Sequence, residues 1–266
     1  MNARSGLLVA GTTLLLLAGC TTTPPPPEEG ADIYRVTPDY RARTNQPYVI
    51  NGITYRPLPT TEGYVEKGIA SWYGADFHNR ATSIGERYDM YGISAAHTVL
   101  PIPCLVRVTN LENGRQMIIR VNDRGPFVKN RLIDLSYGAA KIMGYAEKGT
   151  AMVMVETVNG VSKDLAAKQG FPEGKGEPPP PASKTVAIKQ QPRMFVQLGA
   201  FQDQGNAQKL AQRLRPFGEV KIAPTQVGNK QFYRVRLVTG SSAEEADALV
   251  DRLESKGFPG GQIVVE

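Results

Sequence analysis

Two proline-rich stretches divide this chain and limit what it can fold into. The first follows Cys20 and contains Pro24 to Pro27, and the second contains Pro178 to Pro181. Because proline has no backbone N–H and favours an extended conformation, neither stretch suits a packed helix or sheet. The 266-residue sequence therefore predicts two globular blocks joined by a linker and preceded by a tether. The tether is residues 20–46, the linker 159–192, and the blocks 47–158 and 193–266.

Residues 1–19 are interpreted as a signal peptide. Arg4 precedes an apolar stretch at 7–18, which is shorter than the roughly 18 residues that span a membrane. The stretch is followed by Cys20, and this junction resembles a bacterial lipobox. The resemblance implies cleavage before Cys20 and lipidation of its thiol. Thr21 follows this cysteine, which favours an outer-membrane lipoprotein facing the periplasm. The alternative is an ordinary secretory signal with a chance cysteine.

Composition narrows the class of protein. Apolar residues are 41% and charged residues 21% of the chain, which supports packed domains and excludes wholesale disorder. The net charge of +6 is dispersed along both blocks, so no nucleic-acid partner is expected. If Cys20 is lipidated, Cys104 has no partner and is expected to be a small buried hydrophobe. The histidines, His78 and His97, lack spaced ligand partners, so the sequence predicts no metal site.

The first block is predicted to be mostly β. Two hairpins are expected where Asn51-Gly52 and Asn113-Gly114 separate runs of strand-forming residues, because Asn-Gly is a preferred two-residue turn. A short helix is expected at 137–143, with capping candidates at 134–136 and Gly144 as its stop. Roughly six strands with little helix in about 110 residues predict a small closed β-barrel.

The second block contains an internal repeat. Each half is predicted to form a strand, a helix and a strand, at 194–201, 206–214 and 220–222 and then at 232–238, 243–253 and 262–265. Apolar residues recur at helical spacing in the two middle segments. This βαβ-βαβ order predicts a four-stranded antiparallel sheet with two helices on one face. The other face is left open, and such a face commonly binds a ligand.

Two carboxylates in the first block are candidates for chemistry. Asp123 follows an apolar strand and precedes a Gly-Pro turn, and Glu86 lies in a glycine-containing segment. One carboxyl with a raised pKa would protonate a glycosidic oxygen, and a second would stabilise the positive charge that develops. His97 is a candidate to hydrogen-bond one of them, and Trp72 and Tyr73 are candidates to stack on sugar. Structural roles stay open for all of these side chains on this reasoning.

Six motifs in the first block carry a resemblance to a known family. They occur in order at residues 68–74 (GIASWYG), 85–90 (GERYDM), 95–97 (AAH), 106–111 (VRVTNL), 121–127 (VNDRGPF) and 133–136 (IDLS). Together they resemble the rare lipoprotein A family. The resemblance implies that residues 47–158 form a six-stranded double-psi β-barrel, a fold shared with expansins and some lytic transglycosylases.

The same resemblance implies a lytic transglycosylase. Such an enzyme cleaves the MurNAc–GlcNAc β-1,4 bond of peptidoglycan without water, because the C6 hydroxyl of MurNAc attacks its own C1 and leaves a 1,6-anhydro end. Asp123 would be the acid/base with Glu86 as its partner, and His97 would orient or tune one of them. Asn122 and Arg124 would position the substrate, and no cofactor is required.

The second block resembles a SPOR domain, through residues 195–201 (FVQLGAF) and 233–236 (YRVR). The resemblance implies binding of glycan strands that lack stem peptides, which accumulate at the division septum, where divisome proteins are candidate partners. Gln197 and Arg234 are expected to hydrogen-bond sugar from the open sheet face, and Tyr233 to stack on it. An RNA-binding sheet has a similar topology, but this block has no aromatic-rich RNA-binding motif.

Two other functions stay open on the sequence alone. One is a noncatalytic, expansin-like glycan-binding lipoprotein that links the outer membrane to septal peptidoglycan. The other is a secreted glycosidase of the same barrel type that acts on another polysaccharide. The sequence departs from the family pattern at Asn79, Ile84 and Cys104. Because Ile84 lies two residues before Glu86, it is expected to alter the cleft.

Overall fold

The fold is described from a computed structural model of the chain. The described residues are 33–34, 36–162, 184–185, 192–240 and 242–266. The predicted signal peptide, Cys20, the first part of the tether and most of the linker therefore lie outside the described residues. Within these ranges, no helix combines the length and the apolar character needed to cross a membrane.

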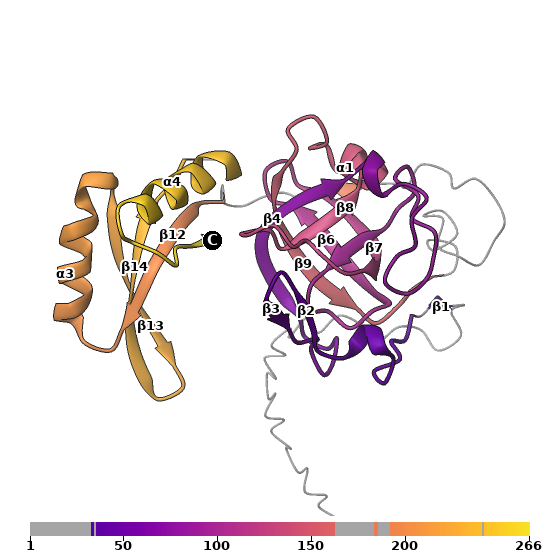
Figure 1. Ribbon diagram of the computed structural model, residues 1–266, viewed down its shortest axis with the longest axis horizontal. Coiled ribbons are helices and arrows are strands. Elements are labelled where there is room, and N and C mark those ends of the chain that lie inside the picture. The colour runs from indigo at the N-terminus through magenta and orange to yellow at the C-terminus, as the bar shows by residue number, and fades with distance from the viewer. Residues whose placement is uncertain (1–32, 35, 163–183, 186–191, 241) are drawn as a thin grey trace, which may run out of the picture. The chain divides into compact units, whose positions relative to one another are not determined.

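Six strands of the first domain form a closed barrel, as predicted (Figure 1). They are β4 (Val65–Tyr73), β5 (Ala95–His97), β6 (Cys104–Asn110), β7 (Arg115–Asp123), β8 (Ile133–Ser136) and β9 (Ala151–Val158). Their order around the barrel is β7-β5-β8-β4-β9-β6, and β6 pairs again with β7 to close the ring. The pairs β4–β8 and β5–β7 are parallel and the others are antiparallel.

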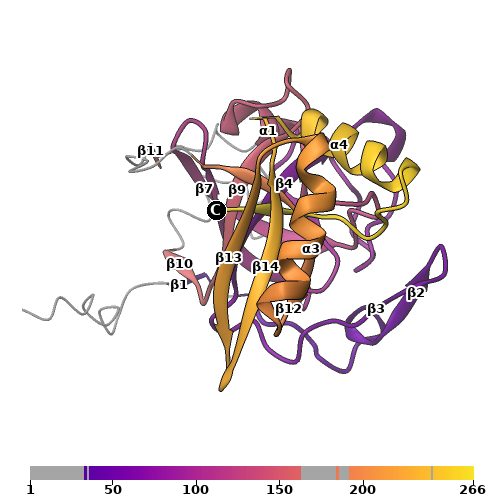
Figure 2. The same cartoon turned by 90° about the vertical axis from the view of Figure 1, so that its left-hand side faces the viewer.

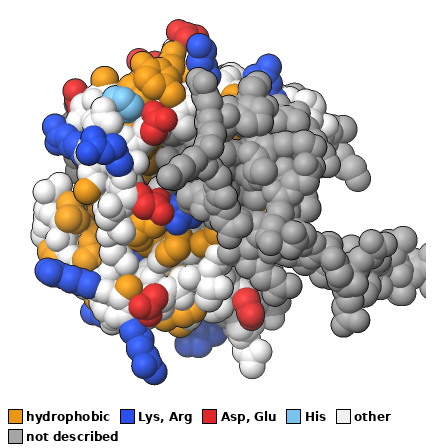
Figure 3. Space-filling model, turned by 90° about the vertical axis from the view of Figure 1, so that its right-hand side faces the viewer, with side chains coloured by type: hydrophobic (Ala, Val, Ile, Leu, Met, Phe, Trp, Pro, Cys, Tyr) orange, Lys and Arg blue, Asp and Glu red, His pale blue; other side chains and the backbone are white. Residues whose placement is uncertain are grey.

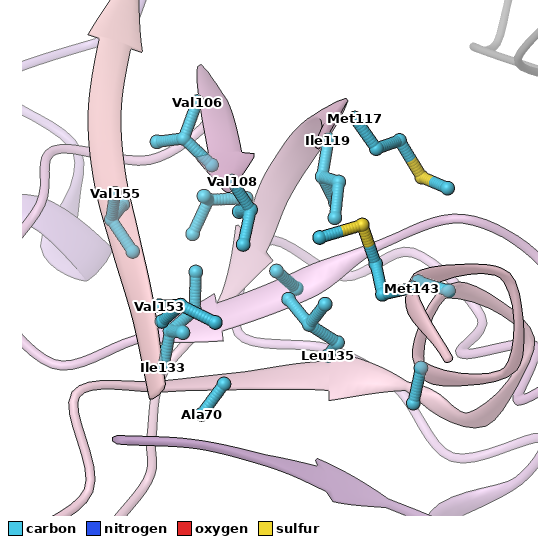
Figure 4. Packing of buried hydrophobic residues seen from close by; sticks show 14 of the residues in the cluster. Ala70, Val106, Val108, Met117, Ile119, Ile133, Leu135, Met143, Val153 and Val155 are labelled. Carbon is cyan, nitrogen blue, oxygen red and sulfur yellow. The ribbon is translucent and has the colours of Figure 1, made fainter. Parts of the chain in front are cut away.

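Alternation along the strands fills the barrel with apolar side chains (Figure 4). On β7, Met117, Ile119 and Val121 are buried and belong to the main core cluster. Ile133 and Leu135 of β8 join the same cluster and are fully buried. Each such side chain contributes about 1.5–3 kcal/mol through burial. A filled interior makes the barrel a rigid support for the side chains at its rim.

Short elements complete the first domain. They are β1 (Ile33–Tyr34) paired with β10 (Val161–Ser162), the 3-10 helices η1 (Arg43–Asn45) and η2 (Ala75–Phe77), the hairpin β2 (Tyr48–Ile50) and β3 (Ile53–Tyr55), and β11 (Lys184–Thr185), which pairs with the start of β7. The hairpin has its predicted turn, since Asn51 and Gly52 both have positive φ, 50° and 78°.

The predicted helix α1 (Tyr137–Met143) is confirmed, and its cap is Ser136. The Ser136 side chain accepts a hydrogen bond from the backbone N–H of Ala139, and Gly144 ends the helix in a left-handed conformation. Asp134 does not cap the helix. It lies inside strand β8, one of the two short strands that the sequence pattern did not reveal.

The second domain has the predicted βαβ-βαβ order. Its elements are β12 (Met194–Phe201), α3 (Gln204–Leu214), η3 (Arg215–Phe217), β13 (Val220–Val227), β14 (Lys230–Val238), α4 (Ala243–Ser255) and β15 (Gln262–Val265). The sheet order is β13-β14-β12-β15, and every pair is antiparallel. Residues of both helices share one apolar cluster with β12 and β14, so α3 and α4 cover the same face of the sheet (Figure 2).

The surface carries charges of both signs. On the face drawn in Figure 3, Lys and Arg side chains alternate with Asp and Glu side chains and with apolar groups over the part that is described. This distribution agrees with the dispersed charge of the sequence. It gives no support to a polyanion partner for that face.

Candidate functional site

A cleft of about 710 Å³ opens at one end of the barrel. Its lining comes from the ends of β4, β5, β7 and β8, from η2 and from the segment that follows β7. The residues that matter for chemistry are Ser71, Trp72, Tyr73, Ala96, Asp123 and Asp134. Residues 47–158 thus bring Asp123 to a cleft together with two carboxyl groups that the sequence analysis did not select, Asp76 on η2 and Asp134 on β8.

Strand register explains why Asp123 and Asp134 meet there. Ala96 on β5 is the partner of Asp123 on β7 and also the partner of Asp134 on β8. Asp134 is in turn the partner of Ser71 on β4. Since neighbouring strands lie about 4.8 Å apart, the two aspartate Cα atoms are about 10 Å apart across Ala96. The small alanine side chain leaves room between the carboxyls for a bound group.

Asp134 lies in a largely buried environment. Burial raises the pKa of Asp134, although the hydrogen bond from Ser71 and the positive charge of Arg131 act in the opposite direction. Ser71 Oγ donates to Asp134 Oδ1 at 2.5 Å. A carboxyl with a raised pKa retains its proton to higher pH, which is the property a general acid requires. The sequence signal that could have identified Asp134 is its position between Ile133 and Leu135, a carboxylate inside an apolar strand.

Asp123 has a different environment. Its Oδ1 accepts hydrogen bonds from the backbone N–H of Ser83 (2.8 Å), from Ser83 Oγ (2.6 Å) and from the backbone N–H of Arg124 (2.8 Å). One oxygen of Asp123 thus accepts three hydrogen bonds, which hold the side chain in place. The cleft therefore pairs a buried carboxyl with one that is polarised by surrounding donors.

Glu86 does not lie among the described residues that line this cleft. Its carboxylate accepts two hydrogen bonds from Arg120, at 2.6 and 2.8 Å, and one from Asn122 Nδ2 at 2.8 Å. Burial acts to raise the pKa of Glu86, but these hydrogen bonds and the charge of Arg120 outweigh it, and the pKa is lowered. The geometry therefore argues against Glu86 as a proton donor and against Asn122 as a direct substrate ligand.

Arg124 is also occupied within the protein. Its Nε and Nη2 donate to Thr44 O, Nη2 donates to Asn45 Oδ1, and Nη1 donates to His97 O and Leu100 O. These bonds use all five N–H groups of the guanidinium. The expected role in positioning substrate is therefore replaced by a structural one. Arg124 fixes η1 and the segment after β5 to the end of β7.

His97 is buried, and both ring nitrogens of its imidazole contact groups other than the predicted carboxylates. Nδ1 accepts from the backbone N–H groups of Val99 (3.2 Å) and Leu100 (2.9 Å), which assigns the proton to Nε2. Nε2 is 3.0 Å from Tyr64 Oη. Burial, reinforced by the charge of Arg124, lowers the pKa of His97 to about 3. The contact of His97 with the cleft lining is made by its backbone carbonyl, which accepts a hydrogen bond from the Arg124 guanidinium.

Trp72 and Tyr73 both line the cleft. Trp72 is half-buried, its Nε1–H donates to a backbone carbonyl at 3.0 Å, and its ring lies 5.1 Å from that of Tyr137. Tyr73 is buried, and one face of its ring is stacked on Tyr88 with 4.0 Å between centroids. Tyr73 is therefore part of the cleft wall. The Trp72 ring packs against the barrel core, on the side of its strand partner Leu135, so the expected stacking of sugar on Trp72 is not supported.

Two further aromatic rings, which the sequence analysis did not select, line the cleft. Phe77 on η2 is 51% exposed and Phe127 is 37% exposed. Phe127 packs edge-on against Tyr55 of the β2–β3 hairpin, with 5.5 Å between centroids. Exposed aromatic rings that are held in place offer apolar faces for sugar rings.

The three departures from the family pattern have structural explanations. Asn79 has φ of 67°, a left-handed conformation that Asn tolerates better than other residues with side chains. Ile84 packs against the barrel core and is not among the cleft-lining residues. Cys104 is buried in the core, as expected, and burial raises the pKa of its thiol to about 12. Among the described residues, no group of three or more His, Cys, Asp or Glu side chains is arranged around a metal site.

The open sheet face of the second domain carries Gln197 and Arg234. Gln197 is the strand partner of Arg236, so these two side chains share a face, and Arg234 lies on that face because it is two residues from Arg236. Arg236 was not selected from the sequence. Its Nε donates to Gln197 Oε1 at 3.2 Å and its Nη1 to Glu266 Oε1 at 2.5 Å.

Tyr233 lies on the opposite face. It packs with Val235 and Leu237 in the cluster beneath the two helices. The expectation that Tyr233 stacks on sugar at the open face is therefore wrong. Phe195 does lie on the open side, where the guanidinium of Arg236 is 5.8 Å from its ring centroid.

The fold and the cleft define a two-domain protein: a double-psi β-barrel with paired carboxyls at its rim, followed by a SPOR-type sheet with one uncovered face. A family model described as lytic transglycolase matches residues 65–155, and a SPOR domain model matches residues 191–264. This chain belongs to the family of the endolytic peptidoglycan transglycosylases RlpA, as its relatives show.

Two of those relatives cover most of the chain. The RlpA transglycosylase of Pseudomonas aeruginosa strain UCBPP-PA14 is 38% identical over 255 residues, which is 80% of this chain and 75% of that protein. The RlpA transglycosylase of Campylobacter jejuni is 35% identical over 250 residues, covering 90% and 88%. The crystal structure of the RlpA SPOR domain from Pseudomonas aeruginosa matches 27% of this chain and 96% of its own at 25% identity, with a TM-score of 0.25.

Proposed function

We propose that this protein is a lytic transglycosylase that cleaves the MurNAc–GlcNAc β-1,4 bond of peptidoglycan glycans and leaves 1,6-anhydro-MurNAc ends. The observation that carries the proposal is the pair of aspartates on either side of Ala96. One is buried with a raised pKa, and the other is surrounded by donors. Two carboxyls in contrasting environments suit an acid and a base that act on one bond. Family membership supports the reaction class.

Asp134 is the proposed general acid. Its proton goes to the glycosidic oxygen of the departing GlcNAc as the bond to C1 of MurNAc breaks. Asp123 is the proposed base, which takes the proton of the MurNAc C6 hydroxyl as that oxygen bonds to C1. One proton is delivered and one is removed, so the step balances without water. The negative charge of Asp123 also stabilises the oxocarbenium-like state between the two events.

Sugar rings are held by the aromatic walls of the cleft in this proposal. Phe77 and Phe127 present apolar ring surface on the cleft, and sugars offer C–H faces that pack on such rings. The polar side chains predicted for positioning, Asn122 and Arg124, instead make contacts within the protein, to Glu86 and to the segments at 44–45 and 97–100 respectively.

The SPOR domain is proposed to bind glycan strands that lack stem peptides and so to recruit the protein to the division septum. Arg234 and Gln197 on the open face supply N–H donors for sugar hydroxyls and for lactyl carboxylates. A lipid on Cys20 would hold the chain in the outer membrane, facing the periplasm, with divisome proteins within reach.

The test compares Asp134→Asn and Asp123→Asn with the wild-type soluble chain that begins at Thr21. Each substitution should lower the rate of anhydro-product formation by about a hundredfold or more, because each removes a proton-transfer group. Binding to stripped glycan strands in a pull-down should persist, since the SPOR face is unaltered. If both variants cleave at the wild-type rate, the site assignment fails. If the wild type binds but yields no product, the protein belongs to the noncatalytic alternative.

A further inference from the structure

We propose that Ser83 is a positioning residue that fixes the catalytic carboxylate of Asp123, and that Glu86 acts only by anchoring the loop that carries Ser83. This inference rests on the proposed function of Asp123. It gives a role to Glu86 that does not require it to enter the cleft. It also gives a role to a serine that the sequence analysis passed over.

Ser83 makes the dominant contact with Asp123. Both its backbone N–H and its hydroxyl donate to Oδ1, at 2.8 and 2.6 Å. The hydroxyl oxygen in turn accepts from the backbone N–H of Arg124 at 3.1 Å. Together with the direct bond from Arg124 N–H, these contacts fix one carboxylate oxygen from three directions. A carboxylate held in this way is restricted to one rotamer, so its second oxygen presents a fixed position to a ligand.

The loop that carries Ser83 is closed on itself. Ala81 and Arg87 form an isolated antiparallel bridge, and the backbone N–H of Thr82 donates to Glu86 O at 2.7 Å. Gly85 turns the chain with φ of 86°. Residues 81–87 are therefore a small hairpin-like unit, and its position depends on what fixes it to the barrel.

Glu86 supplies the polar part of that attachment, and Ile84 packs against the barrel core. Arg120 and Asn122 alternate with the core-facing residues of β7, so both point outward from the strand that ends in Asp123. Their three hydrogen bonds to the Glu86 carboxylate bind the loop to the outer side of β7. The Arg120 side chain is only 11% exposed and that of Glu86 37%, so the bidentate pair is partly shielded from water. Glu86 and Asp123 are thus connected through one strand and one loop.

The experiment measures kcat and KM on stripped glycan strands for four variants of the soluble chain. Ser83→Ala should lower kcat by about tenfold with little change in KM, because a hydrogen bond to a charged group is lost. Ser83→Thr, which keeps the hydroxyl, should recover most of that loss. Glu86→Gln should lower kcat in the same way. The double variant Ser83→Ala/Glu86→Gln should be little worse than either single variant, because the two residues act on one contact.

A second readout does not depend on activity. The side-chain carboxyl carbon-13 resonance of Asp123, assigned by its loss in Asp123→Asn, should shift in Ser83→Ala and in Glu86→Gln. It should not shift in Ser255→Ala, which removes a hydroxyl from α4 in the other domain. If the wild-type protein forms no anhydro product, the proposed function fails. The resonance of Asp123 still tests the positioning role of Ser83 in that case. An unmoved resonance in Ser83→Ala, or full loss of activity in Glu86→Gln with none in Ser83→Ala, overturns the inference.

Discussion

At the scale of single residues, the two aspartates of the cleft differ because their neighbours differ. Asp134 is surrounded by the barrel and has one hydroxyl donor, whereas Asp123 lies at a strand end with three donors on one oxygen. Burial penalises a charge, and donors stabilise it. The same residue type can therefore hold a proton at one position and accept one at the other.

The pH dependence of cleavage should report on Asp134. A general acid must be protonated, so activity should fall as pH rises through its raised pKa. Ser71→Ala removes a hydrogen bond that acts to lower the pKa of Asp134, so the alkaline limb of the kcat/KM profile should move to higher pH. A limb that stays in place or moves to lower pH would contradict the assignment of Asp134 as the acid.

His97 should make the protein sensitive to acid. Its pKa is lowered from 6.5 to about 3 by burial, so below about pH 6.5 the unfolded chain binds a proton that the folded chain does not, and stability is lost as pH falls toward 3. The slope for one such group is about 1.4 kcal/mol per pH unit. His97→Asn keeps an acceptor for Leu100 N–H and has no titrating ring.

The measurement is urea unfolding at about pH 7 and about pH 5 for wild type and His97→Asn. The variant should lose about 2 kcal/mol less than wild type between the two conditions. Its stability at the higher pH should nevertheless be lower, because Tyr64 loses a partner. Equal losses in the two proteins would show that His97 is not buried in its neutral form.

At the scale of elements, the cleft depends on short segments held close to each other. Helix α1 follows directly after β8 and packs on residues 90–92. The backbone N–H of Gly138 donates to Met90 O at 2.8 Å. A Cβ at Gly138 would lie 2.2 Å from Tyr91 O, which is a clash with backbone. Glycine is required here by close approach and not by backbone conformation.

Gly138→Ala therefore tests the packing of α1, and its expected effect on stability is opposite to the usual one. Glycine to alanine inside a helix ordinarily stabilises a protein by about 1 kcal/mol. Here it should destabilise the first domain by about 3 kcal/mol, measured as a lowered midpoint of thermal unfolding. Gly205→Ala in α3 is the matched control and should change stability little. A stabilised Gly138→Ala variant would show that α1 is not held against the 90–92 segment.

At the scale of the whole molecule, the alternation of β14 separates a binding face from a packed one. Arg234 and Arg236 lie on the open side, and Tyr233 lies beneath the helices. In the soluble chain with Asp134→Asn, which keeps glycans intact, Arg234→Ala should weaken binding to stripped strands by about fivefold to tenfold. Tyr233→Phe should bind as well as the parent. Sedimentation of the protein with labelled strands measures both, and the reverse ranking would contradict the assignment of faces.

Much of this architecture was predictable from sequence because it is encoded locally. Asn-Gly turns, helical spacing and caps predicted both hairpins of the first domain, of which β6–β7 is in the barrel and β2–β3 lies outside it, and the order of elements in the second domain. The short strands β5 and β8 carry no such signal, since three or four residues show no period. Their pairing brings Asp123 and Asp134 to either side of Ala96, and that juxtaposition depends on contacts between distant segments.

The partner of Glu86 was hidden for the same reason, since Arg120 is 34 residues away in the sequence. A carboxylate beside a glycine turn is compatible with a cleft or with an ion pair, and only the fold decides between them. The face of the sheet on which Tyr233 lies could have been predicted from the sequence. It alternates with Arg234 and Arg236 and has the same parity as Val235 and Leu237, which form core.

The most direct test of the central claim is mass spectrometry of the products that the soluble wild-type chain releases from amidase-stripped glycan strands. A transglycosylase that uses Asp134 and Asp123 on one bond should yield fragments that end in 1,6-anhydro-MurNAc, each one water lighter than the hydrolysis product. Fragments with reducing ends would instead identify a hydrolase, and intact strands that remain bound to the protein would contradict catalysis at this cleft.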